Sequence, residues 1–87
     1  MAEYYVYMVH CKDNSIYTGC TNNLEKRITA HNNGTGAKYT KARRPVYLIY
    51  QEPCPNRSAA LSREAALKKL SHKEKLAIIA LHNKDNQ

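Results

Sequence analysis

Two strand-like segments joined by a short turn constrain the fold of this chain more than any other feature. Residues 4–11 are rich in aromatic and β-branched side chains, and the same pattern resumes over residues 15–21. Asp13 and Asn14, which lie between them, are residue types that favour tight turns. The sequence therefore predicts a β-hairpin.

Three tyrosines fall on this hairpin, in a chain that has no tryptophan and no phenylalanine. Side chains alternate along a strand, so Tyr5 and Tyr7 share one face, and Tyr17 joins them if the register allows. One interpretation is packing, because tyrosine suits a half-exposed strand. The other is that phenol oxygens are directed at one site.

A helix of about ten residues is predicted to follow, from a capping box formed by Asn22 and Glu25 to a stop signal at Gly34. The apolar stripe of this helix includes His31, and Arg27 lies beside the stripe. A spacing of four residues places these two side chains one above the other, so both can act on a single ligand.

The rest of the chain predicts a third strand and two more helices. Residues 45–51 have the apolar density of a central strand, Ser58 is typical of a helix N-cap, and an S-x-x-E capping box begins at Ser71. The order β-β-α-β-α-α describes a small α+β domain, a three-stranded antiparallel sheet flanked by helices. We expect one domain over residues 1–82 and a short polar tail over residues 83–87.

One acidic side chain stands where burial is expected. At about 100° per residue, Glu64 projects between Ala60 and Leu67, on the stripe that should be apolar. A buried carboxylate needs a cationic partner, which is either an arginine such as Arg27 or a divalent metal ion. Both partners stay open from these residues alone.

The charge of the chain is strongly positive and unevenly distributed. Fourteen Lys and Arg against seven Asp and Glu give a formal net charge of +7, and no acid lies between Glu25 and Glu52. Such a basic block neutralises phosphates in a row, or it is a solvated loop without a partner. The candidate nucleic-acid-binding residues are Lys26, Lys38, Tyr39, Lys41, Arg43 and Arg44.

Cysteine usage and the N-terminal sequence favour a cytoplasmic location. The three cysteines are scattered without a C-x-x-C pair, which favours neither a disulfide framework nor a zinc site. The first residues lack the basic start and long apolar run of a signal peptide, and no segment has the length of a membrane span.

Phosphodiester hydrolysis uses all of these residue types together. A divalent cation held by one carboxylate polarises the phosphorus and stabilises the leaving oxygen. The arginine fork matches the charge that develops on the phosphoryl oxygens. A tyrosine takes a proton from water only beside cations that stabilise its phenolate, since the ordinary pKa of a phenol is about 10.

The motifs Tyr5-Val6-Tyr7 and Tyr17-Thr18-Gly19 resemble the two half-motifs of the GIY-YIG nuclease superfamily. Arg27 and His31 resemble its helix arginine and the His or Tyr one turn later, and Glu64 resembles its metal-binding glutamate. The chain is most similar to the small stand-alone bacterial single-domain members. The resemblance implies an endonuclease that depends on Mg²⁺ or Mn²⁺ and cuts structured or branched DNA, as in DNA repair.

By this resemblance, Tyr7 is the leading general base and Tyr17 its partner at the attacking water, although assignments within the family vary between the two. Arg27 would bind the scissile phosphate, His31 would orient the base or the water, and Glu64 would hold the metal. We expect the five side chains to converge within a few ångströms. A Glu64 carboxylate on the far side of the sheet from the phenols would overturn the nuclease hypothesis.

Two positions depart from the family pattern. Tyr5 takes the place of the glycine that begins the first half-motif in many members, and Cys20 takes the place of a lysine that several catalytic members carry. Lys38 or Lys41 from the basic segment could supply the missing charge. Loss of such electrostatic contacts would slow cleavage, by on the order of 10² for each contact.

Two functions other than cleavage also fit the sequence. One is a nucleic-acid-binding module that keeps the fold and has lost the chemistry, with Tyr39 stacking on an unpaired base. The other is a basic protein-interaction or ribosome-associated domain. DNA is the expected partner and RNA the alternative, and so small a domain favours a homodimer or a targeting protein partner.

Overall fold

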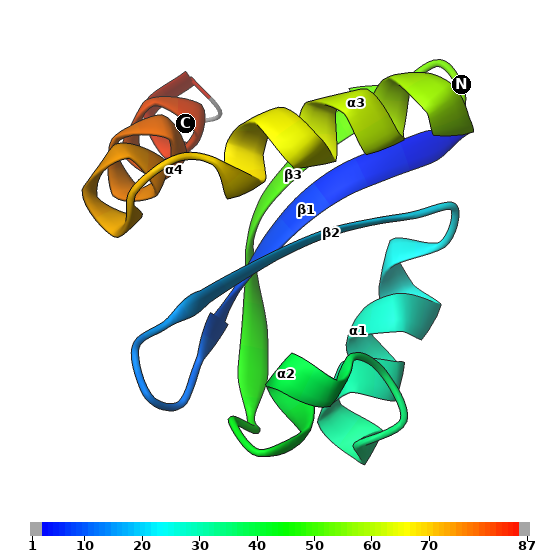
Figure 1. Ribbon diagram of the computed structural model, residues 1–87, viewed down its shortest axis with the longest axis vertical. Coiled ribbons are helices and arrows are strands. Elements are labelled where there is room, and N and C mark those ends of the chain that lie inside the picture. Colours follow the sequence, from blue (N-terminus) through cyan, green and yellow to red (C-terminus); the bar gives the residue numbers. More distant parts are fainter. Residues whose placement is uncertain (1–2, 86–87) are drawn as a thin grey trace.

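A computed structural model describes residues 3–85 as a three-stranded antiparallel sheet with helices on both faces (Figure 1). The α+β class predicted from the sequence is confirmed, with one additional short helix. Within residues 3–85, no helix is long and apolar enough to cross a bilayer. The elements in chain order are β1 (Tyr4–Cys11), β2 (Ile16–Thr21), α1 (Leu24–Asn33), α2 (Lys38–Lys41), β3 (Val46–Cys54), α3 (Arg57–Lys68) and α4 (His72–Asp85).

The predicted hairpin is present, and its register puts the two motif tyrosines on one face. Tyr7 pairs with Gly19 and Val9 pairs with Tyr17 across β1 and β2. Because residues two apart along a strand share a face, Tyr7, Val9 and Tyr17 all point to the same side. Asn14 has a φ of 69° in the turn, a left-handed conformation that asparagine tolerates better than most residues.

Helix α1 begins and ends with local capping contacts. Its N-cap is Asn23, one residue later than predicted, and the Asn23 side chain accepts a hydrogen bond from the Lys26 amide. Gly34 closes the helix as predicted, in the left-handed conformation at φ 82°. These caps fix the length of the helix, and with it the place of Arg27.

Two further helix boundaries and one strand position differ from the sequence prediction. β3 is an edge strand rather than the central one, because β1 pairs with both neighbours, and Tyr47 on β3 is 62% exposed. The N-cap of α3 is Asn56 rather than Ser58. The capping box at Ser71 is confirmed. α4 continues to Asp85, beyond the boundary expected at residue 82, and residues 86 and 87 lie outside the described part.

The sheet separates two hydrophobic cores. Val6 and Met8 face α3 and α4, where they pack with buried residues such as Leu67. Tyr7 and Val9 face α1, and form the second core. In Figure 1, α3 and α1 accordingly lie on opposite sides of the hairpin. Alternation along β1 therefore decides which side chains can meet on each face.

Candidate active site

The phenol of Tyr7 lies directly over Gly19 of the neighbouring strand. A Cβ atom at position 19 would lie 2.6 Å from Tyr7 Oη and 3.2 Å from Tyr17 Cε2. Only glycine leaves room for the buried ring to cross β2 toward α1. Gly19 was not predicted to have this role, although a glycine inside a strand is a known signal of close approach.

Four of the five predicted catalytic residues gather on the α1 face. Tyr7 Oη and His31 Nε2 lie 2.8 Å apart, and Arg27 Nε donates to Tyr7 Oη at 3.3 Å. The Tyr17 ring meets the edge of the His31 ring, with centroids 5.3 Å apart. Tyr7 and His31 are fully buried, whereas Tyr17 and Arg27 are half-buried. The outer members of the cluster are therefore Tyr17 and Arg27.

Burial sets the protonation of the two inner residues. Burial raises the pKa of Tyr7 to about 12 and outweighs the lowering effect of the Arg27 guanidinium. Burial, followed by the positive charge of Arg27, lowers the pKa of His31 to about 4. At neutral pH, Tyr7 is therefore a neutral phenol and His31 a neutral imidazole.

Acid is expected to destabilise the fold through His31. The pKa of this histidine falls from 6.5 to about 4 on folding, so its stabilising contribution is complete above pH 6.5 and is lost as the pH falls toward 4. The loss amounts to about 3 kcal/mol. Chemical denaturation near pH 7 and near pH 4 measures it, with His31→Gln as the reference. Equal losses in the two proteins would contradict a buried neutral His31.

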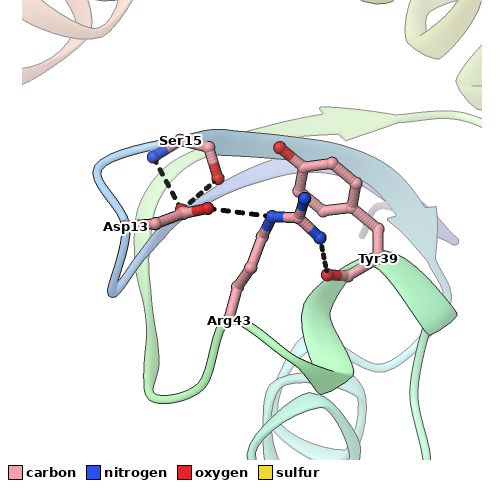
Figure 2. A network of polar contacts seen from close by, with 4 residues as sticks. All are labelled: Asp13, Ser15, Tyr39 and Arg43. Atoms are coloured by element: carbon pink, nitrogen blue, oxygen red, sulfur yellow. Dashed lines mark hydrogen bonds and ion pairs between the residues drawn. The ribbon is translucent and has the colours of Figure 1, made fainter.

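A group of polar contacts, which we call the clasp, joins the hairpin turn to α2 and the residues after it, as Figure 2 shows. The clasp consists of Asp13, Ser15, Tyr39 and Arg43. Arg43 Nε donates to Asp13 Oδ2 at 2.9 Å, Arg43 Nη1 donates to the Tyr39 carbonyl at 2.8 Å, and the guanidinium carbon lies 4.0 Å from the Tyr39 ring centroid. The Tyr39 ring in turn stacks on Tyr17, with centroids 5.7 Å apart. Tyr39 therefore already has an aromatic partner and a cationic partner within the protein.

The Arg44 side chain, like that of Arg43, donates hydrogen bonds within the protein. Its Nε donates to the Lys41 carbonyl at 2.8 Å, and its Nη1 donates to the Asn32 carbonyl at 3.4 Å. These carbonyls belong to the ends of α2 and α1, where a cation satisfies otherwise unpaired acceptors. The lysines predicted to bind nucleic acid, Lys26, Lys38 and Lys41, all have exposed side chains.

A hollow of about 300 Å³ opens beside Arg27, at the end of β2 and the first turn of α1. Amide groups at a helix N-terminus point outward and favour anions, and two cationic side chains add to this field. The hollow can hold a phosphate group. Its lining residues are Thr21, Asn22, Asn23, Lys26, Arg27 and Ala30.

Glu64 does not join the cluster on the α1 face. Its carboxylate lies beside Cys20, where burial and then this acid raise the pKa of the thiol to about 11. Cys20 pairs with Val6, which faces the core under α3, whereas Tyr7 faces the core under α1. The expected convergence of five side chains is therefore corrected: four lie on one face of the sheet and Glu64 on the other.

The half-buried Glu64 side chain also has a different cationic neighbour from the one considered above. Lys68 Nζ lies 3.1 Å from Glu64 Oε2, one turn along α3, so the salt bridge is with Lys68 and not with Arg27. Helix phase predicted that this acid lies near the buried face, but it did not predict which face of the sheet α3 covers. Glu64 on the far face is the arrangement that was expected to overturn the nuclease hypothesis. The two faces meet, however, at the outer edge of β2, where Cys20 interacts with Glu64 and Thr21 lines the hollow, so cleavage is kept as a proposal.

The number of ligating side chains near the site limits which metal ion it can bind. In the described part of the chain, no three His, Cys, Asp or Glu side chains come together. Mg²⁺ does not require such a group, because it is commonly held by one or two carboxylates and takes its remaining ligands from water and phosphate. Glu64 alone therefore fits an ion that arrives with a nucleic acid, and not an ion enclosed by protein.

The hairpin, the four-residue cluster and the sheet order together define the class of this protein. Residues 3–77 match the family described as the GIY-YIG catalytic domain, and the chain belongs to this nuclease family.

Curated relatives of similar length come from several bacteria. The chain is 57% identical over 79 residues to UPF0213 protein SH2523 of Staphylococcus haemolyticus, covering 91% of this chain and 96% of that protein. It is 59% identical over 76 residues to UPF0213 protein CPE1444 of Clostridium perfringens, covering 87% and 82%. These small relatives agree with the stand-alone bacterial type inferred from the sequence.

Two solution NMR structures share the fold. UPF0213 protein BH0048 from Bacillus halodurans is 40% identical, with a TM-score of 0.59 over 90% of this chain and 83% of that one. Protein EF2693 from E. faecalis is also 40% identical, with a TM-score of 0.60 over 94% and 92%. None of these four names states an activity or a substrate.

Proposed function

We propose that this protein is an endonuclease that hydrolyses phosphodiester bonds in structured or branched DNA with the help of Mg²⁺ or Mn²⁺. The observation that carries the proposal is half-buried Arg27, which lines a basic hollow at the end of β2 and interacts with both Tyr7 and Tyr17. A phosphodiester backbone lying along this edge reaches the hollow on one side and Glu64 on the other. Membership of the GIY-YIG family supports the reaction class.

Arg27 is assigned to the scissile phosphate. Its Nε donates to Tyr7 Oη at 3.3 Å and the guanidinium also interacts with Tyr17, which orients it at the hollow, where it would bind a phosphate oxygen. Charge that develops on the phosphoryl oxygens during attack by water is stabilised by this cation. Tyr7 thus acts through Arg27 as a positioning residue.

Tyr17 is assigned to the attacking water. Tyr7 is the less suitable base, because it is fully buried and its pKa is raised to about 12. Tyr17 belongs to the same cluster, with its ring centroid 6.5 Å from that of Tyr7, but it is only half-buried. Tyr17 would first lose its own proton to solvent, and the Arg27 guanidinium beside it would stabilise the phenolate. The phenolate would then take a proton from water as the hydroxide attacks phosphorus and the bond to the leaving oxygen breaks, and solvent water would return a proton to that oxygen.

Glu64 is assigned to the metal ion. When bound, Mg²⁺ or Mn²⁺ supplies positive charge to the phosphate and to the leaving oxygen. Glu64 offers one carboxylate from α3, now paired with Lys68. The exposed lysines of α2, Lys38 and Lys41, would bind phosphates away from the cut.

The position of Glu64 also favours a second candidate function. Glu64 lies on the opposite face of the sheet from the phenols and is already paired with Lys68. This arrangement is compatible with a module that binds nucleic acid without cleaving it. Such a module would keep the hollow and the exposed lysines. A cytoplasmic location, and a homodimer or a targeting protein partner, stay predictions from the sequence for either function.

A substrate panel distinguishes these functions. The purified protein is mixed with flap, fork, four-way junction, duplex and single-stranded DNA, and with an RNA flap, in Mg²⁺, in Mn²⁺ or in EDTA. We expect metal-dependent nicking of the branched DNA, no nicking in EDTA, and loss of nicking in Glu64→Ala. Glu3→Ala, which removes an exposed acid outside the site, serves as the control. Equal trace nicking in wild type and Glu64→Ala would leave only the binding module.

A further inference from the structure

The buried pair of Tyr7 and His31 is connected to α2 by a threonine that the sequence analysis did not consider. Thr40 is fully buried, and its Oγ1 lies 2.8 Å from His31 Nδ1. The same Oγ1 donates to the Ala37 carbonyl at 2.9 Å. Both nitrogens of the His31 ring therefore have a close polar partner, Tyr7 on one side and Thr40 on the other.

The bond that the Thr40 hydroxyl proton makes determines which nitrogen of the neutral His31 ring carries the proton. A hydroxyl has one proton, and a carbonyl oxygen can only accept, so this proton belongs to the bond with Ala37. Thr40 Oγ1 must then accept from His31 Nδ1–H. A neutral imidazole carries one N–H, which leaves Nε2 as an acceptor for the Tyr7 hydroxyl.

We propose that Thr40 is a positioning residue that keeps the proton of neutral His31 on Nδ1 and so makes the Tyr7 hydroxyl a hydrogen-bond donor. The hydrogen bonds then run in one direction, from Arg27 Nε to Tyr7 Oη, from Tyr7 to His31, and from His31 to Thr40. Every polar atom in this series has the partner that it needs.

The opposite tautomer, with the proton on Nε2, would create two unfavourable polar contacts. Thr40 would have to donate to His31 Nδ1, so that its oxygen would face the Ala37 carbonyl at 2.9 Å without a proton between them. The Tyr7 proton would also lose its acceptor, because in the described part of the chain the hydrogen-bond partners of Tyr7 Oη are His31 and Arg27, and arginine cannot accept. An unpaired buried donor is unfavourable.

One longer contact favours the opposite tautomer and is outweighed. The Ala37 amide points at His31 Nδ1 from 3.4 Å, which would require a lone pair on that nitrogen. The bonds at 2.8 Å and 2.9 Å through Thr40 are shorter and decide the assignment. This amide nevertheless identifies the donor that would take over if the threonine hydroxyl were removed.

Close packing keeps the segment before α2 against the histidine. A Cβ atom at Gly36 would lie 2.5 Å from His31 Nδ1 and 3.0 Å from its Cα. Only glycine therefore permits the chain to pass at this distance. The geometry that brings Thr40 to the ring is thus built into the backbone between α1 and α2.

The test is direct observation of the tautomer by NMR. Long-range proton–nitrogen spectra of the ¹⁵N-labelled full chain are recorded near pH 7 for wild type, Thr40→Ser and Thr40→Val. We expect His31 protonated on Nδ1 in wild type and in Thr40→Ser, which keeps the hydroxyl. In Thr40→Val, which keeps the shape, the Ala37 amide should donate to Nδ1 and the proton should move to Nε2.

A wild-type His31 protonated on Nε2 would overturn the proposal, as would a Thr40→Val protein that keeps the proton on Nδ1. If Thr40→Val does not fold, the tautomer observed in wild type and in Thr40→Ser decides whether the proposal stands. The consequence for cleavage rests on the proposed function: in Thr40→Val the rate at saturating DNA should fall about 10- to 100-fold, with affinity for DNA unchanged. A wild type that does not cleave would refute the nuclease assignment and leave the tautomer result standing.

Discussion

Replacing Arg27 with alanine is expected to lower the rate of DNA cleavage at saturating substrate by a factor on the order of 10² to 10³. Arg27 lines the hollow at the end of β2 and receives its orientation from the Tyr7 oxygen. Without the guanidinium, the charge that develops on the phosphoryl oxygens has no fixed cation beside it. Single-turnover kinetics on the preferred substrate measures the effect separately from binding.

Two further variants sharpen the Arg27 prediction. Arg27→Lys keeps the charge but loses the planar fork, so it should recover only part of the activity. Lys84→Ala removes a positive charge from an exposed position on α4, away from the site, and should cleave like wild type. An Arg27→Ala protein that also cleaves at the wild-type rate would refute the assignment of the phosphate to this hollow.

Removing the Tyr17 hydroxyl is expected to lower cleavage by about 10² to 10⁴, as for loss of a general base. Tyr17 is the half-buried phenol of the cluster, and Tyr17→Phe removes only its oxygen and leaves the rings packed. Little change in the free energy of unfolding is expected. Single-turnover cleavage and chemical denaturation are measured on the same preparations.

Tyr7→Phe is the matched comparison, because it also deletes one phenol oxygen. It leaves buried His31 Nε2 without a partner and releases Arg27 Nε, so it should reduce the free energy of unfolding by about 1 to 3 kcal/mol. Its cleavage rate should fall less than that of Tyr17→Phe. The reverse order, with Tyr7→Phe the slower enzyme, would make Tyr7 the base and refute the proposed division of roles.

The hairpin and α1 were predictable because their signals are local. Turn residues, strand alternation and helix caps act over a few positions, so the sequence placed Tyr7, Tyr17, Arg27 and His31 on the correct elements. Register then brought them to one face. The error of one residue at the N-cap, Asn23 instead of Asn22, did not change which side chains meet.

Long-range geometry was not predictable in the same way. The phase of α3 showed that Glu64 lies near a buried stripe, but the face of the sheet that the helix covers depends on the chain path through β3. Helix α2 has only four residues and no periodic pattern, so it appeared as part of a basic loop. Thr40 gave no sequence signal, because a threonine in a loop is ordinary until its partner is known.

The central claim is that nucleic acid binds along the outer edge of β2, beside Arg27. NMR titration of the ¹⁵N-labelled protein with a branched DNA, first in EDTA and then in Mg²⁺, tests this claim most directly. We predict the largest shifts at the Gly19 and Cys20 amides and at Arg27 Nε–H, with changes around Glu64 only after Mg²⁺ is added. Shifts confined to β3 and α4, with β2 and Arg27 unaffected, would contradict the claim.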